Sequence, residues 1–158
     1  HDCDEVMFAE SAQQKADLWR ARRAVGEAVK SHSVYKEEDT VVPRASLPLL
    51  LAGVKKIGDK YGFRSVCYGH AGDGNLHVNI IKDGMTDEEW NRKLPLGIQE
   101  IFELCVSLNG TISGEHGIGW VQKNYMSIRF SEVEIELQKG IKKLFDPNNI
   151  LNPSKIFV

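Results

Sequence analysis

Apolar residues recur at helical spacing in four segments of the chain, separated by polar positions. The first segment covers residues 8–30. The second begins at Ser46, a good N-cap, and ends at Gly62, a good C-cap. The third contains Pro95, which predicts a kink or a break. The last two segments begin with capping boxes, formed by Thr86 with Glu89 and by Ser131 with Glu134.

Three shorter runs are rich in β-forming residues. They cover residues 39–42, closed by Pro43, and residues 64–68 and 76–81, which are joined by a glycine-rich turn. Residues 146–158 form an irregular tail rich in Asn and Pro. Short strands flanked by helices predict an α+β fold, with an antiparallel sheet and helices packed on one face.

Length and composition suit one compact globular domain of 158 residues. The formal net charge of −2 gives no electrostatic reason to expect nucleic acid as a partner. No apolar run approaches the roughly 18–20 residues of a transmembrane helix. Three cysteines without paired spacing favour reduced thiols and a cytoplasmic location. Because the chain begins at His1, we expect it to be a piece of a longer protein.

Two histidines flank the glycine-rich turn. If residues 72–75 form its loop, His70 lies directly opposite His77, with Cβ atoms roughly 4.5–5.5 Å apart, and the two imidazoles could share a metal ion. Asn79 follows His77 by two residues and therefore points to the same face. The alternative is a hairpin that carries two surface histidines.

A second glycine-rich segment, residues 114–119, contains Glu115 and His116. Glu115 could complete a set of two nitrogens and one oxygen, which is common for catalytic zinc or a similar divalent ion. His116 would remain free as a proton acceptor. The alternative is a loop at a helix entry with charged residues by chance. Neither glycine segment has the GxGxxG order of a dinucleotide site.

Arg22 lies in line with Leu18, Val25 and Val29 on the apolar stripe of the first helix. A guanidinium in that position needs an anion, and a substrate carboxylate would form a bidentate pair with it. The alternatives are an internal Asp or Glu, or a place at the edge of the stripe.

Five segments taken together identify a family: LWRARR, VVPRASLP, YGHAGDGNLHVN, GTISGEHGIG and LFDPNNILNPSKIF. Between residues 18 and 156 the chain resembles the C-terminal domain of the FAD-linked oxidases, such as glycolate oxidase, D-lactate dehydrogenase and D-2-hydroxyglutarate dehydrogenase. The resemblance implies a ferredoxin-like cap domain whose FAD is bound mainly by an N-terminal domain outside this chain. It also implies hydride transfer from a D-2-hydroxy acid, of glycolate or D-lactate type, to FAD. The resemblance further implies a separate electron acceptor that reoxidises the flavin. If that acceptor is in a membrane, the protein would associate with the membrane surface through it.

The resemblance also assigns roles to individual residues. It implies that His70, His77 and Glu115 hold a divalent metal, with zinc expected, and that His116 takes the proton of the substrate hydroxyl. It assigns substrate binding to Arg22, Lys36 and Asn79. It also implies that the tail, residues 146–158, returns to the flavin domain, where Asn152 and Lys155 would contact the flavin. This chain alone should then be inactive.

Two departures from the family pattern stand out. Ser154 replaces a glycine of the usual NPGK tail, and Gly26 stands where relatives of the 2-hydroxyglutarate type have a hydroxyl residue.

Two other functional classes stay open from the residues alone. They are a self-contained metal-dependent hydrolase and a non-catalytic ligand-binding α+β module.

Overall fold

The computed structural model describes residues 7–157. The chain divides into two compact units, His1–Val34 and Tyr35–Val158. Each unit is described by itself. The first contains helix α1, Ala12–His32, whose N-cap Ser11 accepts a hydrogen bond from the backbone N–H of Gln14.

The predicted apolar stripe of α1 is only partly buried. Val29 is buried, Val25 and Arg22 are half-buried, and Leu18 is exposed. The prediction of a buried stripe is therefore wrong for the N-terminal half of α1. Within residues 7–34, the described part of the first unit, α1 is the only helix or strand, so this unit itself supplies no second layer to cover the apolar side chains.

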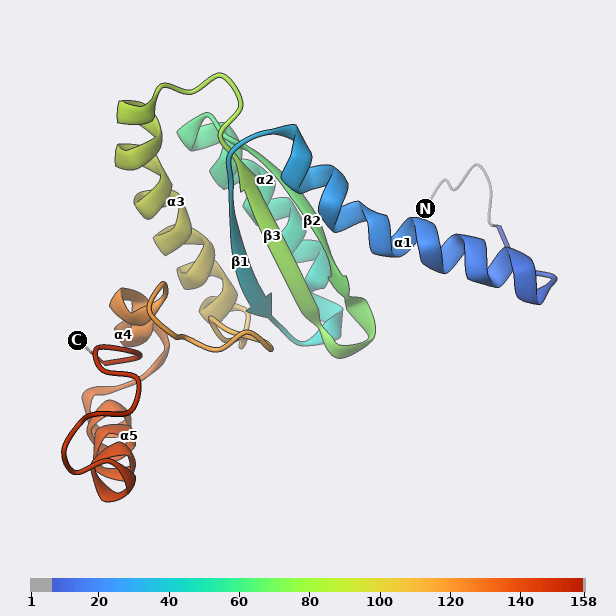
Figure 1. Cartoon of the computed structure of the whole chain (residues 1–158). Helices are drawn as coiled ribbons and strands as arrows, with labels where there is room; N and C mark the ends of the chain where they lie inside the picture. Colours follow the sequence, from blue (N-terminus) through green and yellow to red (C-terminus); the bar gives the residue numbers. More distant parts are fainter. Residues whose placement is uncertain (1–6, 158) are drawn as a thin grey trace. The chain divides into compact units, whose positions relative to one another are not determined.

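The second unit is built on a three-stranded antiparallel sheet with the order β1-β3-β2 (Figure 1). Its strands are β1, Tyr35–Val41, β2, Arg64–His70, and β3, Asn75–Ile81. Strand β1 begins four residues before the predicted run at Asp39. Charged residues have low β-propensity, so only the pairing of β1 with β3 along its whole length makes this segment a strand.

Helices α2, Leu47–Tyr61, and α3, Asp87–Ser107, cover one face of this sheet (Figure 1). The core lies between them and the side chains of alternate β3 residues, and its members include Leu50, Val54, Leu76, Val78, Ile80, Ile101 and Phe102. The α+β class and the sheet with helices on one face are confirmed. Of the kink or break predicted at Pro95, the break does not occur, because α3 continues through this residue. Buried residues on both sides of Pro95, such as Trp90 and Ile98, bind the helix to one core.

The predicted helix ends are set by local chemistry. Both capping boxes are confirmed, at the starts of α3 and of α5, Glu132–Phe145. Gly62 ends α2 in the left-handed conformation, with φ of 80°. Ser46 occupies the N-cap position of α2, but its side chain makes no capping bond. Short 3₁₀ turns cover Arg44–Ser46, Ala71–Asp73 and Lys123–Tyr125, and the last leads into α4, Met126–Arg129.

In the described part of the tail, residues 146–157, there is no helix or strand, as predicted. It is nevertheless held by specific bonds. The Asp146 carboxylate accepts hydrogen bonds from the backbone N–H groups of Ile150 and Leu151, and the N–H of Ile156 donates to the Gly119 carbonyl. Among residues 7–157, no helix has the length and apolar composition needed to cross a bilayer.

Candidate functional site

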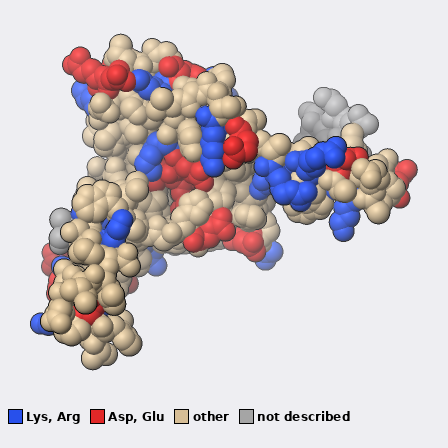
Figure 2. Space-filling view, viewed as in Figure 1, with Lys and Arg blue, Asp and Glu red and all other residues tan. Residues whose placement is uncertain are grey.

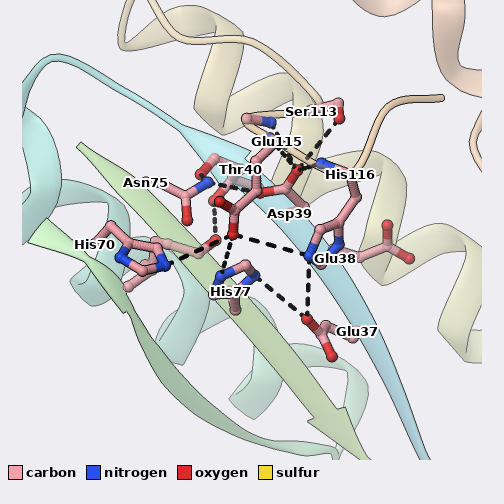
Figure 3. Close-up of polar contacts among 12 residues, drawn as sticks. Glu37, Glu38, Asp39, Thr40, His70, Asn75, His77, Ser113, Glu115 and His116 are labelled. Atoms are coloured by element: carbon pink, nitrogen blue, oxygen red, sulfur yellow. Dashed lines mark hydrogen bonds and ion pairs between the residues drawn. The ribbon is translucent and has the colours of Figure 1, made fainter. Parts of the chain in front are cut away.

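The sheet face opposite α2 and α3 is polar. It gathers Glu37 and Asp39 from β1, His70 from β2, and Asn75 and His77 from β3 (Figure 3). Asn79 of β3 pairs with Glu37 and lies on the same face. A loop of residues 113–117 lies against this face and brings Glu115 and His116 to it. The cluster therefore combines three strands with a loop more than 30 residues further along the chain.

The hairpin that carries the two histidines has a different register from the predicted one. Residues 71–74 form the turn, so His70 pairs with Asn75, and His77 pairs with Tyr68. The prediction that His70 lies directly opposite His77 is wrong. The turn closes earlier because Gly74, with φ of 77°, donates its N–H to the Ala71 carbonyl. The two registers differ by one side-chain period, so both histidines still lie on the same face.

His70, His77 and Glu115 converge, as expected from the sequence. Glu115 Oε1 lies 2.9 Å from His77 Nε2 and 3.7 Å from His70 Nε2. One donor atom from each residue lies within 4.8 Å of the others. Zinc holds such ligands at about 2.0–2.2 Å, which places ligand atoms of one shell roughly 3–3.5 Å apart. The His70 and Glu115 side chains are 53% and 49% exposed and can adjust, so this donor set fits a divalent ion.

His116 lies beside this set, with its ring stacked on His77 at a centroid distance of 5.0 Å. Its Nε2 atom is 3.9 Å from the nearest carboxylate oxygen of both Glu37 and Glu115. Glu37 also approaches the other side of His77, with Oε1 3.3 Å from Nδ1. A ligating histidine commonly has such a carboxylate at its second ring nitrogen. Glu37, His77 and His116 form a second group that could hold an ion, which shares His77 with the first.

Asn79 is fully buried on the same face. Neither atom of its side-chain amide has a hydrogen-bond partner among the described residues. Leaving a buried amide unpaired costs roughly 1–3 kcal/mol. A bound ligand that forms hydrogen bonds with the Asn79 amide would remove this cost, so the unpaired amide favours a ligand-binding site here.

Three other predicted site residues, Lys36, Asn152 and Lys155, contact partners outside the cluster. Lys36 pairs with Ile80 in the sheet and so belongs to the helix-covered face, where its ammonium bonds Glu38 Oε1 at 2.5 Å. Arg22 belongs to the first unit, and its place beside His116 stays a prediction. In the tail, Asn152 accepts a backbone bond from Lys155, whose ammonium lies 5.9 Å from the Trp120 ring centroid.

The residues of the cluster differ in how far they are exposed to solvent. His70, Glu115 and His116 are about half exposed, whereas His77 and Asn79 are buried. The face is thus open at its rim and closed at its floor.

Sequence reasoning missed two acidic residues of the cluster, Glu37 and Asp39. Asp39 is 1% exposed, and its Oδ2 accepts hydrogen bonds from the backbone N–H groups of Gly114, Glu115 and His116 at 2.7–2.8 Å. Its Oδ1 accepts one from Asn75 Nδ2 at 2.6 Å. Burial raises the pKa of Asp39, but these hydrogen bonds and the nearby His116 hold the pKa below its usual value. The available signal was a run of three acidic residues in a segment that the sheet buries.

Nearly the whole chain matches one protein family and several curated relatives. The chain matches the family model "FAD linked oxidases, C-terminal domain" over residues 1–156. It is 40% identical over 154 residues to a D-2-hydroxyglutarate dehydrogenase of Stutzerimonas stutzeri, covering 96% of this chain and 33% of the relative. It is 35% identical over 153 residues to a D-lactate dehydrogenase of Anaerostipes hadrus, covering 96% and 32%. A third relative is glycolate oxidase subunit GlcD of Escherichia coli K12, 38% identical over 152 residues, covering 96% and 30%.

The chain therefore spans about a third of the length of these curated relatives. The three relatives are named for different 2-hydroxy acids.

Proposed function

Because the chain belongs to the FAD-linked oxidases and matches their C-terminal domain, we propose that it is the substrate-side domain of a flavin-dependent dehydrogenase that oxidises a D-2-hydroxy acid to the 2-oxo acid. The observation that carries the proposal is the convergence of His70, His77 and Glu115 beside a half-exposed His116. The three relatives are named for D-2-hydroxyglutarate, D-lactate and glycolate, all of which have a hydroxyl on the carbon next to a carboxylate. Gly26 provides no hydroxyl for a second carboxylate, which favours a small substrate of glycolate or D-lactate type.

In this proposal His70, His77 and Glu115 hold a divalent ion, with zinc as the expected metal. When bound, the ion would bind and polarise the hydroxyl oxygen of the substrate, and FAD would accept the hydride. His116 takes the hydroxyl proton. Two carboxylates, Glu37 and Glu115, each approach His116 Nε2 to 3.9 Å and stabilise the imidazolium that results.

Substrate binding is assigned to Asn79 and Arg22. The unpaired amide of Asn79, two residues from His77, offers a donor and an acceptor for a substrate oxygen. Arg22 would supply the planar fork that matches a carboxylate. Lys36 is left out of the proposed set because its ammonium is bonded to Glu38 on the other face of the sheet.

The tail and α5 are proposed to contact the flavin domain. An apolar stripe along α5 is 54–80% exposed and consists of Val133, Leu137, Ile141, Leu144 and Phe145. In Figure 2 the surface of α5 and the tail is largely free of charged atoms on the face shown. A contiguous apolar surface of this kind marks an interaction site. The tail that follows it carries Asn152 and Lys155, the residues assigned to the cofactor.

The test of the proposed function is a panel of 2-hydroxy acids mixed with the full-length flavoprotein, with loss of flavin absorbance as the measurement. A D-2-hydroxy acid should reduce the flavin, and His116→Gln should slow that reduction by about 10²–10⁴-fold, the usual contribution of a general base. His32→Gln, which removes a histidine from α1, is the matched control and should leave the rate unchanged.

Failure of every 2-hydroxy acid to reduce the flavin would overturn the proposal. So would turnover by this chain alone with added FAD. Hydrolysis of an ester by this chain with zinc, abolished in His70→Gln, would favour a self-contained metal-dependent hydrolase instead.

A further inference from the structure

Asp39 is a buried carboxylate that the proposed chemistry does not use. It is 1% exposed, and among the described residues no lysine or arginine forms a salt bridge with it. Burying a carboxylate without a partner is costly, so its charge has to be balanced by hydrogen-bond donors. The donors to Oδ2 come from one loop: three consecutive backbone N–H groups, of Gly114, Glu115 and His116, point at this single oxygen. Figure 3 shows Glu115 and His116 beside Asp39.

We propose that Asp39 is a positioning residue, whose buried carboxylate fixes the backbone of residues 113–117 so that Glu115 and His116 meet His77. This inference rests on the proposed function, which gives Glu115 and His116 their roles. Asp39 itself touches neither substrate nor reacting atoms.

The carboxylate joins three parts of the chain. Asp39 belongs to β1, its Oδ1 is bonded to Asn75 at the start of β3, and its Oδ2 is bonded to the loop. Asn75 pairs with His70 in the hairpin. The Asp39 carboxylate is therefore linked to two of the three candidate metal ligands: to Glu115 directly, through its backbone N–H, and to His70 through Asn75. The Ser113 hydroxyl also approaches Oδ2, at 3.3 Å, and accepts a bond from the N–H of Gly117.

The loop is packed tightly against this anchor. A Cβ atom added to Gly114 would lie 2.1 Å from Asn75 Nδ2 and 3.0 Å from Asp39 Oδ1. The loop therefore has little freedom to move while its amides remain bonded. Bonds at 2.7–2.8 Å to an ionised acceptor are roughly twice as strong as neutral ones.

The decisive variant is Asp39→Asn, which keeps the shape and removes the charge. Glu38→Gln is the matched control, because Glu38 is the next residue of β1, is also 1% exposed and is bonded to Lys36 and Gln122 on the other face of the sheet. Two readouts are made on the full-length protein: binding of Co²⁺ by its visible absorption spectrum, and hydrogen exchange of the backbone amides.

In Asp39→Asn, we expect the Co²⁺ dissociation constant to rise about 10–100-fold, as for other outer-shell changes. The amides of Gly114, Glu115 and His116 should exchange at least about tenfold faster, since each loses a bond to an ionised acceptor. Amides of the core strand β3 should be unchanged, which a general loss of stability would not allow. Glu38→Gln should change neither Co²⁺ binding nor exchange in residues 114–116 by more than about twofold.

Equal Co²⁺ binding and equal loop exchange in Asp39→Asn and the wild type would overturn the inference. If the wild type binds no Co²⁺, the metal part of the proposed function fails, and loop exchange still decides the role of Asp39. If Asp39→Asn does not fold, Gly114→Ala replaces it, because the added Cβ displaces the loop and leaves the charge. Unchanged loop exchange in Gly114→Ala would then count against the inference, and acceleration confined to residues 113–117 would support it.

Discussion

The turn between the two histidines depends on one glycine, and Gly74→Ala tests this. Gly74 has φ of 77°, and a Cβ atom placed on it would lie 2.0 Å from the backbone carbonyl oxygen of Val42. That oxygen cannot rotate away as a side chain can. The N–H of Val42 also donates to the Gly74 carbonyl at 3.1 Å, so separating the two segments stretches this bond as well.

The expected loss is the sum of two contributions. A left-handed conformation costs an L-residue roughly 1–2 kcal/mol. Stretching a backbone hydrogen bond by more than 1 Å removes about 0.5–1.5 kcal/mol, and more if the groups stay buried and unpaired. Gly74→Ala should therefore lower the free energy of unfolding by about 1.5–3.5 kcal/mol.

Two other glycines separate the contributions. Gly62 has φ of 80° with nothing within 4 Å of an added Cβ, so Gly62→Ala should show only the conformational cost, about 1–2 kcal/mol. Gly72 lies in the same turn as Gly74, also has open space, and is not in the left-handed region. Gly72→Ala should therefore be neutral or stabilising, by up to about 1 kcal/mol.

The assay is urea unfolding followed by tryptophan fluorescence. Trp90 is buried in the core of the second unit, whereas Trp19 and Trp120 are exposed, so the change on unfolding reports mainly that core. If Gly74→Ala loses no more stability than Gly62→Ala, the close approach to the Val42 carbonyl does not constrain the turn, and the reasoning is refuted.

Three further predictions concern a buried thiol and the tail. Burial raises the pKa of Cys105 to about 11, so iodoacetamide at pH 8 should leave it unmodified in the folded protein and label it in urea, as read by mass spectrometry; labelling without urea would contradict this. The Lys142 ammonium, together with the N–H groups of Ile150 and Leu151, holds the pKa of Asp146 below its usual value. Asp146 therefore stabilises the tail above the unfolded pKa of about 3.9, and this is lost as the pH falls through the lower folded pKa. Exchange of the Ile150 amide, corrected for intrinsic rate, should accelerate over that range and be fast at neutral pH in Asp146→Asn; equal protection in the variant would refute it. Ser154 has φ of 62°, so Ser154→Gly should slow amide exchange in the tail by up to about tenfold, and faster exchange would contradict the idea that glycine suits this position better.

Residues that act on their immediate neighbours could be read from the sequence. The capping boxes at Thr86 and Ser131 and the stop at Gly62 were predicted at their observed positions, because each depends on bonds within four residues along the chain. Alternation in β3 likewise placed His77 and Asn79 on one face. Residue chemistry also selected His70, Glu115 and His116, since charged or imidazole side chains between glycines are unsuited to a core.

Features that depend on distant contacts were missed or misjudged. The hairpin turn of residues 71–74 is bonded to Val42 through the Gly74 carbonyl, a contact between residues far apart in sequence, and the full length of β1 follows from its pairing with β3. Pro95 stays inside one helix because the apolar residues around it share a core.

Asp39 is the clearest case of the division between sequence and tertiary structure. The sequence by itself identified His70, His77 and Glu115 as candidate metal ligands and His116 as a candidate proton acceptor. Only the tertiary structure decided how they are held together, because the amides that Asp39 binds lie 75–77 residues away along the chain. A carboxylate in a strand has no local reason to be buried. It becomes an anchor only when folding brings a loop of unpaired N–H groups against it and removes water from both.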